Sequence, residues 1–318
     1  MTTDDRRPTT GEDTVEGSVE GSVEGSVEGS VEGSVEGSVE GSAGGSAEGS
    51  GSVAVGGPPS SARALWSRGD FHRIGVTQQV VGELLVADLH VHTGERVLDV
   101  AGGTGNTALA AARRWADVTC TDAVPELLAI ARERATAERV PLRVRVAEVE
   151  DLPFPDGAFD VVTSTFGLMY APDQHRAAGE LLRVLRPGGR LGLTAWTPGG
   201  WCGQQAALSA RYLPAEPGRA APTAWGEPAH VRALLGDRVE DLRAVARRSA
   251  ITAASTTELF DLWLRCAAPL AAFFDALAPE RRPDARREWI ALADRFDGAG
   301  DGTCEIAAEY LSVTAVKR

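Results

Sequence analysis

The sequence lacks long apolar runs. No stretch of about 18 apolar residues, the length a membrane-spanning helix needs, occurs in its 318 residues. The first seven residues, MTTDDRR, carry charges where a secretion signal has its apolar core, so no targeting segment is expected. These two absences predict a cytoplasmic protein with no membrane partner.

Metal-ligand and disulfide patterns are also missing. The four cysteines, at positions 120, 202, 266 and 304, are widely separated and form no C-x-x-C pair. The five histidines supply no ligand spacing around them. Structural zinc and a disulfide framework are therefore not expected, and we predict no metal site.

The folded part lacks an excess of positive charge. The formal net charge is −13, but residues 1–57 alone hold 12 acidic side chains against 2 arginines. Residues 58–318 hold 33 acidic and 30 basic side chains, so they are nearly neutral. Because nucleic acids and anionic membranes are bound through clustered Lys and Arg, we expect neither as a partner.

The N-terminal part contains a repeat. Residues 15–42 are seven consecutive copies of Val-Glu-Gly-Ser, followed by degenerate copies. One valine in four residues cannot form an apolar face, and the Gly-Ser content keeps the conformational entropy of the chain high. We predict that residues 1–57 are a disordered tail and that residues 58–318 form the functional domain. Whether the tail binds a partner or has no specific role stays open.

From about Leu65 onward, short apolar runs alternate with amphipathic segments. Strands are expected at 97–100, 118–122, 142–146, 159–162 and 190–196. The helices expected between them lie at 108–115, from Pro125, and from His175 to a stop at Pro187-Gly188-Gly189. This alternation implies βαβ units, and hence a Rossmann-like α/β fold with helices on both faces of a mostly parallel sheet.

The alternation breaks down beyond Pro198. A helix is expected at 228–235, and strands near 242–251 and 309–316 complete a seven-stranded sheet. Two helical patterns, at 257–266 and 270–296, separate these last two strands. Since ligands of such sheets bind at the carboxyl ends of the strands, we interpret residues 255–296 as a small helical cap over a substrate pocket.

A glycine-rich turn follows the first expected strand. It reads Gly102-Gly103-Thr104-Gly105, and Asn106 is the expected N-cap of the next helix. Glycines let the backbone approach a ligand closely, and a helix N-terminus offers free N–H groups to negative charge. Gly103-x-Gly105-x-x-Ala108 also satisfies the dinucleotide-binding pattern, so the turn alone is ambiguous.

Three acidic residues favour a different ligand. Asp122 ends the second expected strand, 17 residues after Gly105, where it can accept both hydroxyls of a ribose. Glu148 follows the third strand, and its carboxylate can accept from an adenine amino group while the next N–H serves a ring nitrogen. Asp99, at the tip of the first strand, would repel a pyrophosphate but suits a cationic ligand.

These residues resemble the class I S-adenosylmethionine-dependent methyltransferases, in the ubiquinone/menaquinone-biosynthesis-like branch that is common among natural-product enzymes. The resemblance covers about residues 65–318. It implies S-adenosylmethionine as the cofactor and a small molecule as the partner. The motifs that carry it, in order, are Leu98-Asp99-Val100-Ala101-Gly102-Gly103-Thr104-Gly105-Asn106, Asp122, Glu150-Asp151-Leu152-Pro153-Phe154, Phe159-Asp160-Val161-Val162 and Arg183-Val184-Leu185-Arg186-Pro187-Gly188-Gly189.

The resemblance implies a role for each group of residues. The backbone of residues 101–105 would wrap the methionine part, Asp122 would bind the ribose, and residues 148–149 the adenine. Residues 164 and 166 would lie near the sulfonium, and an aromatic lip at 66 and 71 would fold over the cofactor. Core packing is the alternative for the aromatics, and helix capping for Asp122. The full expected set is Trp66, Phe71, Asp99, Ala101, Gly102, Gly103, Gly105, Asn106, Asp122, Ala123, Glu148, Val149, Ser164 and Phe166.

The sequence departs from the family pattern at two positions. Cysteine is frequent in the family where Gly102 stands, a tolerable difference because the backbone does the binding. Aspartate is usual where Glu148 stands, and the extra methylene could displace the adenine contact.

No general base is evident. Related O-methyltransferases often carry a histidine after the fourth strand, where this sequence has Met169 and Tyr170. The catalytic candidates are therefore His72, Tyr170 and His175, with a surface position the alternative for His175. The apolar Met-Tyr pair suggests a small, largely apolar metabolite, methylated on oxygen or carbon. Further candidates for its pocket are the late aromatics Trp201, Tyr212, Trp225, Trp263 and Phe274.

Two alternatives stay open. A non-catalytic cofactor-binding module would show a damaged glycine turn or a missing ribose acid, and the sequence shows neither. A nicotinamide-dependent oxidoreductase would use the ambiguous turn, but the sequence lacks a Tyr-x-x-x-Lys pair, and its single lysine is Lys317. Nucleic-acid amino-methyltransferases carry an Asn/Asp-Pro-Pro-aromatic turn where this chain has Ser164-Thr165-Phe166-Gly167. The oligomeric state cannot be predicted.

Overall fold

The computed structural model describes residues 61–213 and 220–318, so the expected tail at 1–57 lies outside the described residues. Within this part, seven strands form one sheet in the order β3-β2-β1-β4-β5-β7-β6. The strands are β1 Arg96–Val100, β2 Asp117–Asp122, β3 Arg143–Val146, β4 Phe159–Thr165, β5 Leu185–Trp196, β6 Val239–Ala253 and β7 Cys304–Lys317.

The sheet is mostly parallel, as the sequence predicted. Strands β3, β2, β1, β4 and β5 pair in parallel, and β7 runs antiparallel to both β5 and β6. The strand order reverses between β1 and β4, because β2 and β3 extend to one side of β1 and the later strands to the other. Ligands of open α/β sheets bind outside the carboxyl ends of the strands at such a reversal.

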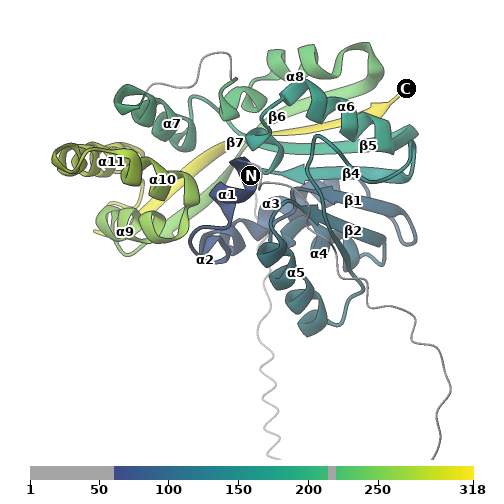
Figure 1. Ribbon diagram of the computed structural model, residues 1–318, viewed down its shortest axis with the longest axis horizontal. Coiled ribbons are helices and arrows are strands. Elements are labelled where there is room, and N and C mark those ends of the chain that lie inside the picture. Colours follow the sequence, from purple (N-terminus) through teal and green to yellow (C-terminus); the bar gives the residue numbers. More distant parts are fainter. Residues whose placement is uncertain (1–60, 214–219) are drawn as a thin grey trace, which may run out of the picture. The chain divides into compact units, whose positions relative to one another are not determined.

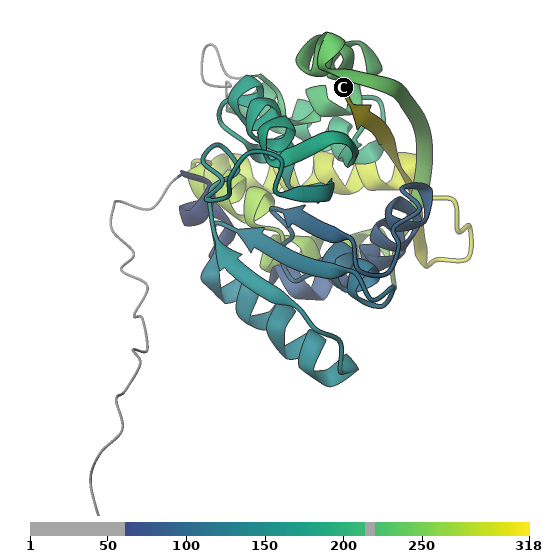
Figure 2. The same ribbon diagram turned by 90° about the vertical axis from the view of Figure 1, so that its right-hand side faces the viewer.

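Helices cover both faces of the sheet, which confirms the predicted fold class (Figures 1 and 2). Buried residues of α3, α4 and α5 form one apolar core against the strands, and those of α6 and α8 form another. The bounds of these helices are α3 Gln79–Asp88, α4 Asn106–Ala112, α5 Pro125–Glu138, α6 Gln174–Val184 and α8 Pro228–Leu235.

The expected stop of α6 at Pro187-Gly188-Gly189 is wrong, because the helix ends at Val184. Leu185, which is fully buried, already pairs with Phe159 as the first residue of β5. The register then shifts before Arg190, so the Pro-Gly-Gly segment forms an irregular stretch inside β5. The helix α6 therefore ends where the buried Leu185 enters the sheet, and Pro187, Gly188 and Gly189 belong to β5.

A group of helices lies beyond the carboxyl ends of the parallel strands. Trp196, the last residue of β5, pairs with Tyr310, so the earlier residues of β7 extend past the end of β5. The helices there pack against Ile306 and Ala308 of this extension and against Ile251 of β6 (Figure 1). They are α7 Trp201–Tyr212, α9 Thr256–Cys266, α10 Ala268–Ala276 and α11 Arg282–Phe296.

The helices α9, α10 and α11, hereafter the cap, occupy the segment predicted to be helical. The second expected helix, 270–296, is two helices, because the chain turns through Leu277 and a short 3-10 helix at Pro279–Arg281. The sequence analysis missed four α-helices of the described residues: α1 Ser61–Trp66, α2 Phe71–Gly75, α3 and α7. The short α2 has no side-chain cap bond that would have marked its start.

Candidate functional site

The glycine turn between β1 and α4 contains three residues with left-handed backbone. Ala101, Gly103 and Gly105 have φ values of 50°, 56° and 87°. The strain at Ala101, which has a Cβ, is of the kind that clusters at ligand sites. A Cβ built on Gly103 meets only Phe71 Cε1, at 4.0 Å, so this glycine faces open space beneath the Phe71 ring. The turn therefore offers its backbone to a ligand lying under Phe71.

Gly102 lies in a different environment, against the protein interior. A Cβ at this position would fall 2.6 Å from both Asp99 Oδ2 and Cys120 Sγ. Cys120, on the neighbouring strand β2, thus fills the space that a side chain at 102 would need. Because residue 102 is glycine, Cys120 Sγ can occupy the space next to it. The path of the turn therefore depends on the close contact of Gly102 with Cys120.

Asp99 supports the turn from below. Its Oδ1 accepts a hydrogen bond from Thr163 Oγ1 at 2.8 Å, and its Oδ2 accepts from the backbone N–H of Ala108 at 3.0 Å. Burial raises the pKa of this carboxyl to about 7, although the Thr163 bond opposes that shift. Both oxygens are engaged by the protein, so Asp99 joins β1, β4 and the first turn of α4.

The expectation that Asn106 is the N-cap of α4 is wrong. Gly105 is the N-cap, in the left-handed conformation that glycine adopts easily, and Asn106 is the first helical residue. The Asn106 side chain donates to Gly75 O at 2.8 Å and accepts from Arg134 Nη1 at 2.8 Å. Arg134 also donates to Thr104 O at 2.7 Å. These contacts fasten α2 and α5 to the glycine turn, a role of Arg134 that the sequence analysis missed.

Asp122 lies at the carboxyl end of β2, beside the turn. Its Oδ2 accepts from the N–H of Gly103 at 2.9 Å, and its Oδ1 accepts from the N–H of Val124, just before α5, at 3.0 Å. Burial, with a smaller effect of Glu148, raises the pKa of Asp122 to about 6. A carboxylate has about four lone-pair sites, so acceptor capacity remains. Helix-start support and a ligand contact are therefore compatible in this residue.

Residues 148–149 follow β3 next to Asp122. The N–H of Ala147 donates to Asp122 O at 3.0 Å, and Glu148 O accepts from the N–H of Asp151 at 3.1 Å. Glu148 and Val149 are both half-buried, and the Glu148 carboxylate lies near enough to Asp122 to affect its pKa. The geometry brings these predicted residues together at the ends of β2 and β3.

The two residues predicted near the sulfonium lie on either side of the end of β4, and their environments differ. Ser164 is fully buried, and its Oγ accepts from the N–H of Leu168 at 3.1 Å, so it shapes the following turn. Phe166 has a left-handed backbone with φ 59°, and its ring stacks on Trp196 with centroids 3.8 Å apart. A Cβ on Gly167 would overlap Ala101, so the turns after β1 and β4 pack directly on each other.

The N-terminal aromatics reach this site. Trp66 makes edge-to-face contacts with Phe71, at 5.1 Å between centroids, and with Tyr170, at 4.7 Å. The segment also contacts the cap, because Arg68 Nη2 donates to Asp275 Oδ2 at 2.6 Å. We use the term lip for residues 66–75, which lie between the glycine turn and the cap.

The three catalytic candidates differ in placement. His72 Nδ1 lies 3.2 Å from Thr104 Oγ1, and burial, followed by the charge of Arg134, lowers its pKa. Burial raises the pKa of the Tyr170 phenol far above its ordinary value, so it stays protonated. His175 is exposed on the first turn of α6, away from the lip contacts. His72 is the candidate that combines a neutral ring with a position at the turn.

Four of the five late aromatics lie in or beside the cap's own core. Trp201 packs edge-to-face on Trp263 at 4.8 Å between centroids, and Phe274 is buried against Phe260. The Tyr212 hydroxyl donates to Glu288 Oε1 at 2.9 Å. The fifth, Trp225, instead lines a narrow cavity near β5.

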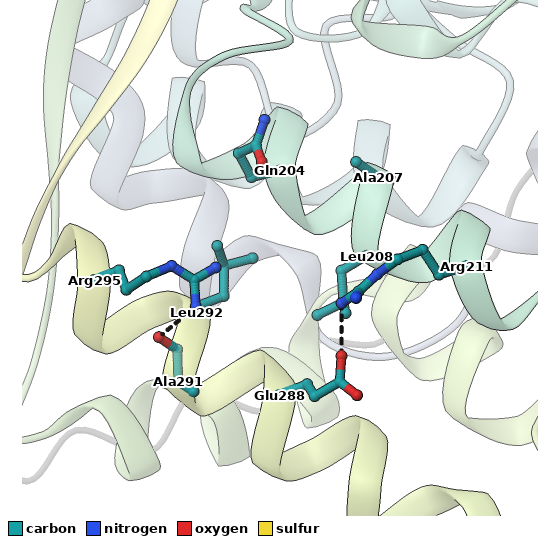
Figure 3. Close-up of a pocket in the computed structure, with 8 residues that line it drawn as sticks. All are labelled: Gln204, Ala207, Leu208, Arg211, Glu288, Ala291, Leu292 and Arg295. Atoms are coloured by element: carbon teal, nitrogen blue, oxygen red, sulfur yellow. Dashed lines mark hydrogen bonds and ion pairs between the residues drawn. The ribbon is translucent and has the colours of Figure 1, made fainter.

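A wider cavity of about 440 Å³ lies between α7 and α11 (Figure 3). Apolar side chains of both helices contribute to its lining, and the ion pair of Arg211 with Glu288 lies at one end. None of the predicted cofactor residues lines it, so it is separate from the glycine turn. The lining residues are Gln204, Ala207, Leu208, Arg211, Glu288, Ala291, Leu292 and Arg295.

Comparisons with known proteins agree with this geometry. The family described as "Methyltransferase domain" matches residues 98–193. An uncharacterized protein of Mycobacterium tuberculosis is 36% identical over 261 residues, covering 80% of this chain and 94% of the relative. A demethylmenaquinone methyltransferase of Thermus thermophilus is 47% identical over 106 residues, 33% of this chain and 48% of that protein. The solved structure of the YcgJ protein of Bacillus subtilis has a TM-score of 0.50 at 19% identity, covers 74% of this chain and 97% of that one, and supports the fold alone.

The matched family, together with the fold, identifies an α/β methyltransferase. The chain belongs to the class I S-adenosylmethionine-dependent methyltransferases of the ubiquinone/menaquinone-biosynthesis type, and S-adenosylmethionine is its cofactor. This membership resolves the ambiguity of the glycine turn against a dinucleotide. In the part of the chain that the structure describes, no helix is long and apolar enough to cross a bilayer.

Proposed function

We propose that the enzyme methylates an oxygen or carbon atom of a small, largely apolar molecule. The observation that carries the proposal is the arrangement around Asp122. A buried carboxylate with remaining acceptor capacity lies beside a glycine turn that is open toward the ring of Phe71. Aromatic and apolar side chains then continue from this point along the ends of β4 and β5.

The residues present fit the cofactor. Asp122 would accept the ribose hydroxyls, Glu148 and Val149 would hold the adenine, and the backbone around Gly103 would follow the methionine part. Phe71 would cover the bound molecule from the lip, with Trp66 behind it. When bound, S-adenosylmethionine supplies a methyl group that its sulfonium already activates.

The protein's own contribution is alignment and exclusion of water. Phe166 and Trp196 form a stacked pair at the ends of β4 and β5, where an apolar acceptor can lie against them. His72 would take a proton from a hydroxyl acceptor, because its lowered pKa keeps the ring neutral at pH 7. An acceptor that arrives already ionised would need no base.

We also propose that the cap covers the acceptor, and that residues 58–318 form the catalytic unit. Phe71 and Ile74 of the lip pack with the apolar core of the cap. Any closure of the lip over the cofactor is thereby linked to the cap. The Thermus relative, whose name describes an enzyme acting on demethylmenaquinone, supports a small apolar acceptor.

The test uses purified protein, methyl-labelled S-adenosylmethionine and a small-molecule extract of the source organism, with products separated by mass. The proposal predicts a discrete labelled small molecule, whose fragments identify the methylated atom. Label found only in protein or RNA would contradict it. His72→Ala and His175→Ala are then compared on that product, and a loss of kcat restricted to His72→Ala supports the assigned base.

A further inference from the structure

One long edge of the sheet has no neighbouring strand. Strand β6 is last in the strand order, and within the described residues it pairs with β7 alone. Among the same residues, the backbone of 240–250 makes one further hydrogen bond, from Gln78 Nε2 to Ala250 O at 3.3 Å. Exposed residues occur along the whole of this stretch. A long edge strand with free N–H and C=O groups can pair with a strand of another chain.

A β-bulge near the start of β6 brings charged residues onto one face of the strand. Glu240 and Arg243 pair with residues of β7 that are two positions apart, although three positions separate them on β6. Because alternate residues of a strand share a face, Glu240 and Arg243 lie on the same face. Val245 and Arg247 continue this face. Its first residue is therefore acidic, and two basic residues follow.

The same face carries exposed apolar side chains. Arg247 Nη1 lies 2.8 Å from Asp88 Oδ2 of α3, so this is the face on which α3 packs. Val245, two residues before Arg247, is 49% exposed. Leu84, one helical turn before Asp88, is 41% exposed. Both apolar groups therefore lie beside the ion pair, next to the open edge of the sheet.

The order of these residues is complementary to itself in an antiparallel pair of strands. Counted along the shared face, a two-fold axis at Ala244 places Glu240 of one copy opposite Arg247 of the other. Arg243 then lies opposite Val245, whose apolar surface the aliphatic stem of the arginine can cover. An axis at Val245 would instead place Arg243 opposite Arg247, and like charges directly opposite are unfavourable. The charges therefore favour the register centred on Ala244.

We propose that the protein forms a two-fold dimer in which β6 pairs with β6 of a second copy, so that one sheet continues through both. The charge complementarity along the strand is the reason for choosing a second copy as the occupant. A two-fold axis perpendicular to the sheet keeps both α3 helices on the same side, so Leu84 of each copy lies beside the joined strands. Strand β1, at the cofactor site, is separated from β6 by β4, β5 and β7, so this interface does not depend on the identity of the acceptor.

The test measures the mass of the full chain in solution by sedimentation velocity. We expect a concentration-dependent dimer that is populated at about 100 μM protein. Val245→Arg opposes a new charge to Arg243 at the centre of the interface and should give a monomer. Val146→Arg is the matched control, because Val146 is 37% exposed on β3, the strand at the other edge of the sheet. This control should stay dimeric.

An exchange of charges tests the register. Glu240→Arg should prevent association, because two basic side chains become opposed. The double variant Asp88→Arg/Arg247→Glu keeps an ion pair within the chain but opposes two acidic side chains, so it should also be monomeric. An equal mixture of these two proteins brings opposite charges together at both ends of the pair and should restore the dimer. Thermal unfolding confirms that each variant is folded.

The contradicting results are equally specific. A full chain that is monomeric at about 100 μM would identify the arginines of β6 as charges that keep the edge unpaired, and would overturn the proposal. Dissociation by Val146→Arg and not by Val245→Arg would place the interface at β3 instead. A mixture of the two charge variants that stays monomeric would refute the assigned pairing of the strands.

Discussion

At the scale of single residues, Asp122 would have to contact both the protein backbone and the cofactor. The N–H groups of Gly103 and Val124 both donate to its buried carboxylate, which would also have to accept from the cofactor ribose. Asp122→Asn keeps the shape but removes the charge and leaves one acceptor oxygen. A hydrogen bond to a charged group is worth about 1.5–3 kcal/mol, so we expect roughly tenfold to hundredfold weaker binding of S-adenosylmethionine by calorimetry.

The matched control is Asp117→Asn, at the opposite end of β2. Asp117 forms a half-exposed ion pair with Arg143 at 2.5 Å, far along the strand from the glycine turn. This variant should bind the cofactor as the unmodified protein does. Circular dichroism confirms that both variants are folded, and equal affinities in the two would contradict the role assigned to Asp122.

The raised pKa of Asp122 predicts a pH dependence of binding. In the free protein its pKa is about 6, so the carboxylate that must accept from the ribose is protonated below that pH. The Kd for S-adenosylhomocysteine should rise as pH falls below 6, by at most about tenfold per pH unit for a single proton. Asp122→Asn should abolish this dependence, and an unchanged pH profile in that variant would assign it to another group.

Low pH is expected to weaken cofactor binding, but it should increase the free energy of unfolding of the ligand-free protein. Asp122 and Asp99 have folded-state pKa values of about 6 and about 7, above the ordinary value near 3.9 of an unfolded chain. Between these values the folded state binds more protons, so the free energy of unfolding decreases as pH rises from about 4 to 7. Thermal unfolding across this range measures it, and the decrease should be smaller in Asp122→Asn.

At the scale of elements, the path of the glycine turn depends on the strand beside it. Gly102→Ala would place a Cβ 2.6 Å from Asp99 Oδ2 and Cys120 Sγ, so the turn or β2 must move. Overpacking of this kind costs about 1–3 kcal/mol. We expect a lower Tm and weaker cofactor binding, with partial recovery in the double variant Gly102→Ala/Cys120→Ala, because one of the two overlaps is removed.

Gly179→Ala in α6 is the control for Gly102→Ala. A Cβ on Gly179 meets nothing within 4 Å, and alanine favours a helix by about 1 kcal/mol over glycine. This variant should gain stability and bind the cofactor normally. A Gly102→Ala protein as stable as Gly179→Ala would show that Cys120 does not constrain the turn.

Elements differed in how far the sequence could predict them. Strands β1, β2 and β4 are short and mostly buried, and the β-branched residues Val and Thr that favour strands are frequent in them. The positions of Asp99, Asp122 and Glu148 follow, because they stand at the ends of β1 and β2 and just after β3. The lip aromatics Trp66 and Phe71 were predicted, but helices α1, α2, α3 and α7 were not. The helices α1 and α2 have only 6 and 5 residues, and α3 and α7 begin without a side-chain cap bond that would mark their start. The contact of Gly102 with Cys120, and the burial of Ser164, depend on strand pairing that no local pattern reveals.

At the scale of the whole molecule, the catalytic unit is proposed to begin after residue 57. A protein comprising residues 58–318 should keep the Tm, the cofactor affinity and the kcat of the full chain. Phe71→Ala in the full chain should weaken cofactor binding about tenfold, because its ring covers Gly103 and leads to the cap. Loss of activity on removal of residues 1–57 would instead give the tail a function.

The proposed cofactor site lies at the carboxyl ends of β1, β2 and β4, and the predictions for single residues, elements and the whole molecule all depend on it. A structure of the protein crystallised with S-adenosylhomocysteine tests it most directly. We predict that the ribose hydroxyls contact Asp122, that the adenine lies beside Glu148 and Val149, and that Phe71 covers the ligand. A ligand bound elsewhere, or a ribose held by groups other than Asp122, would contradict the proposed site.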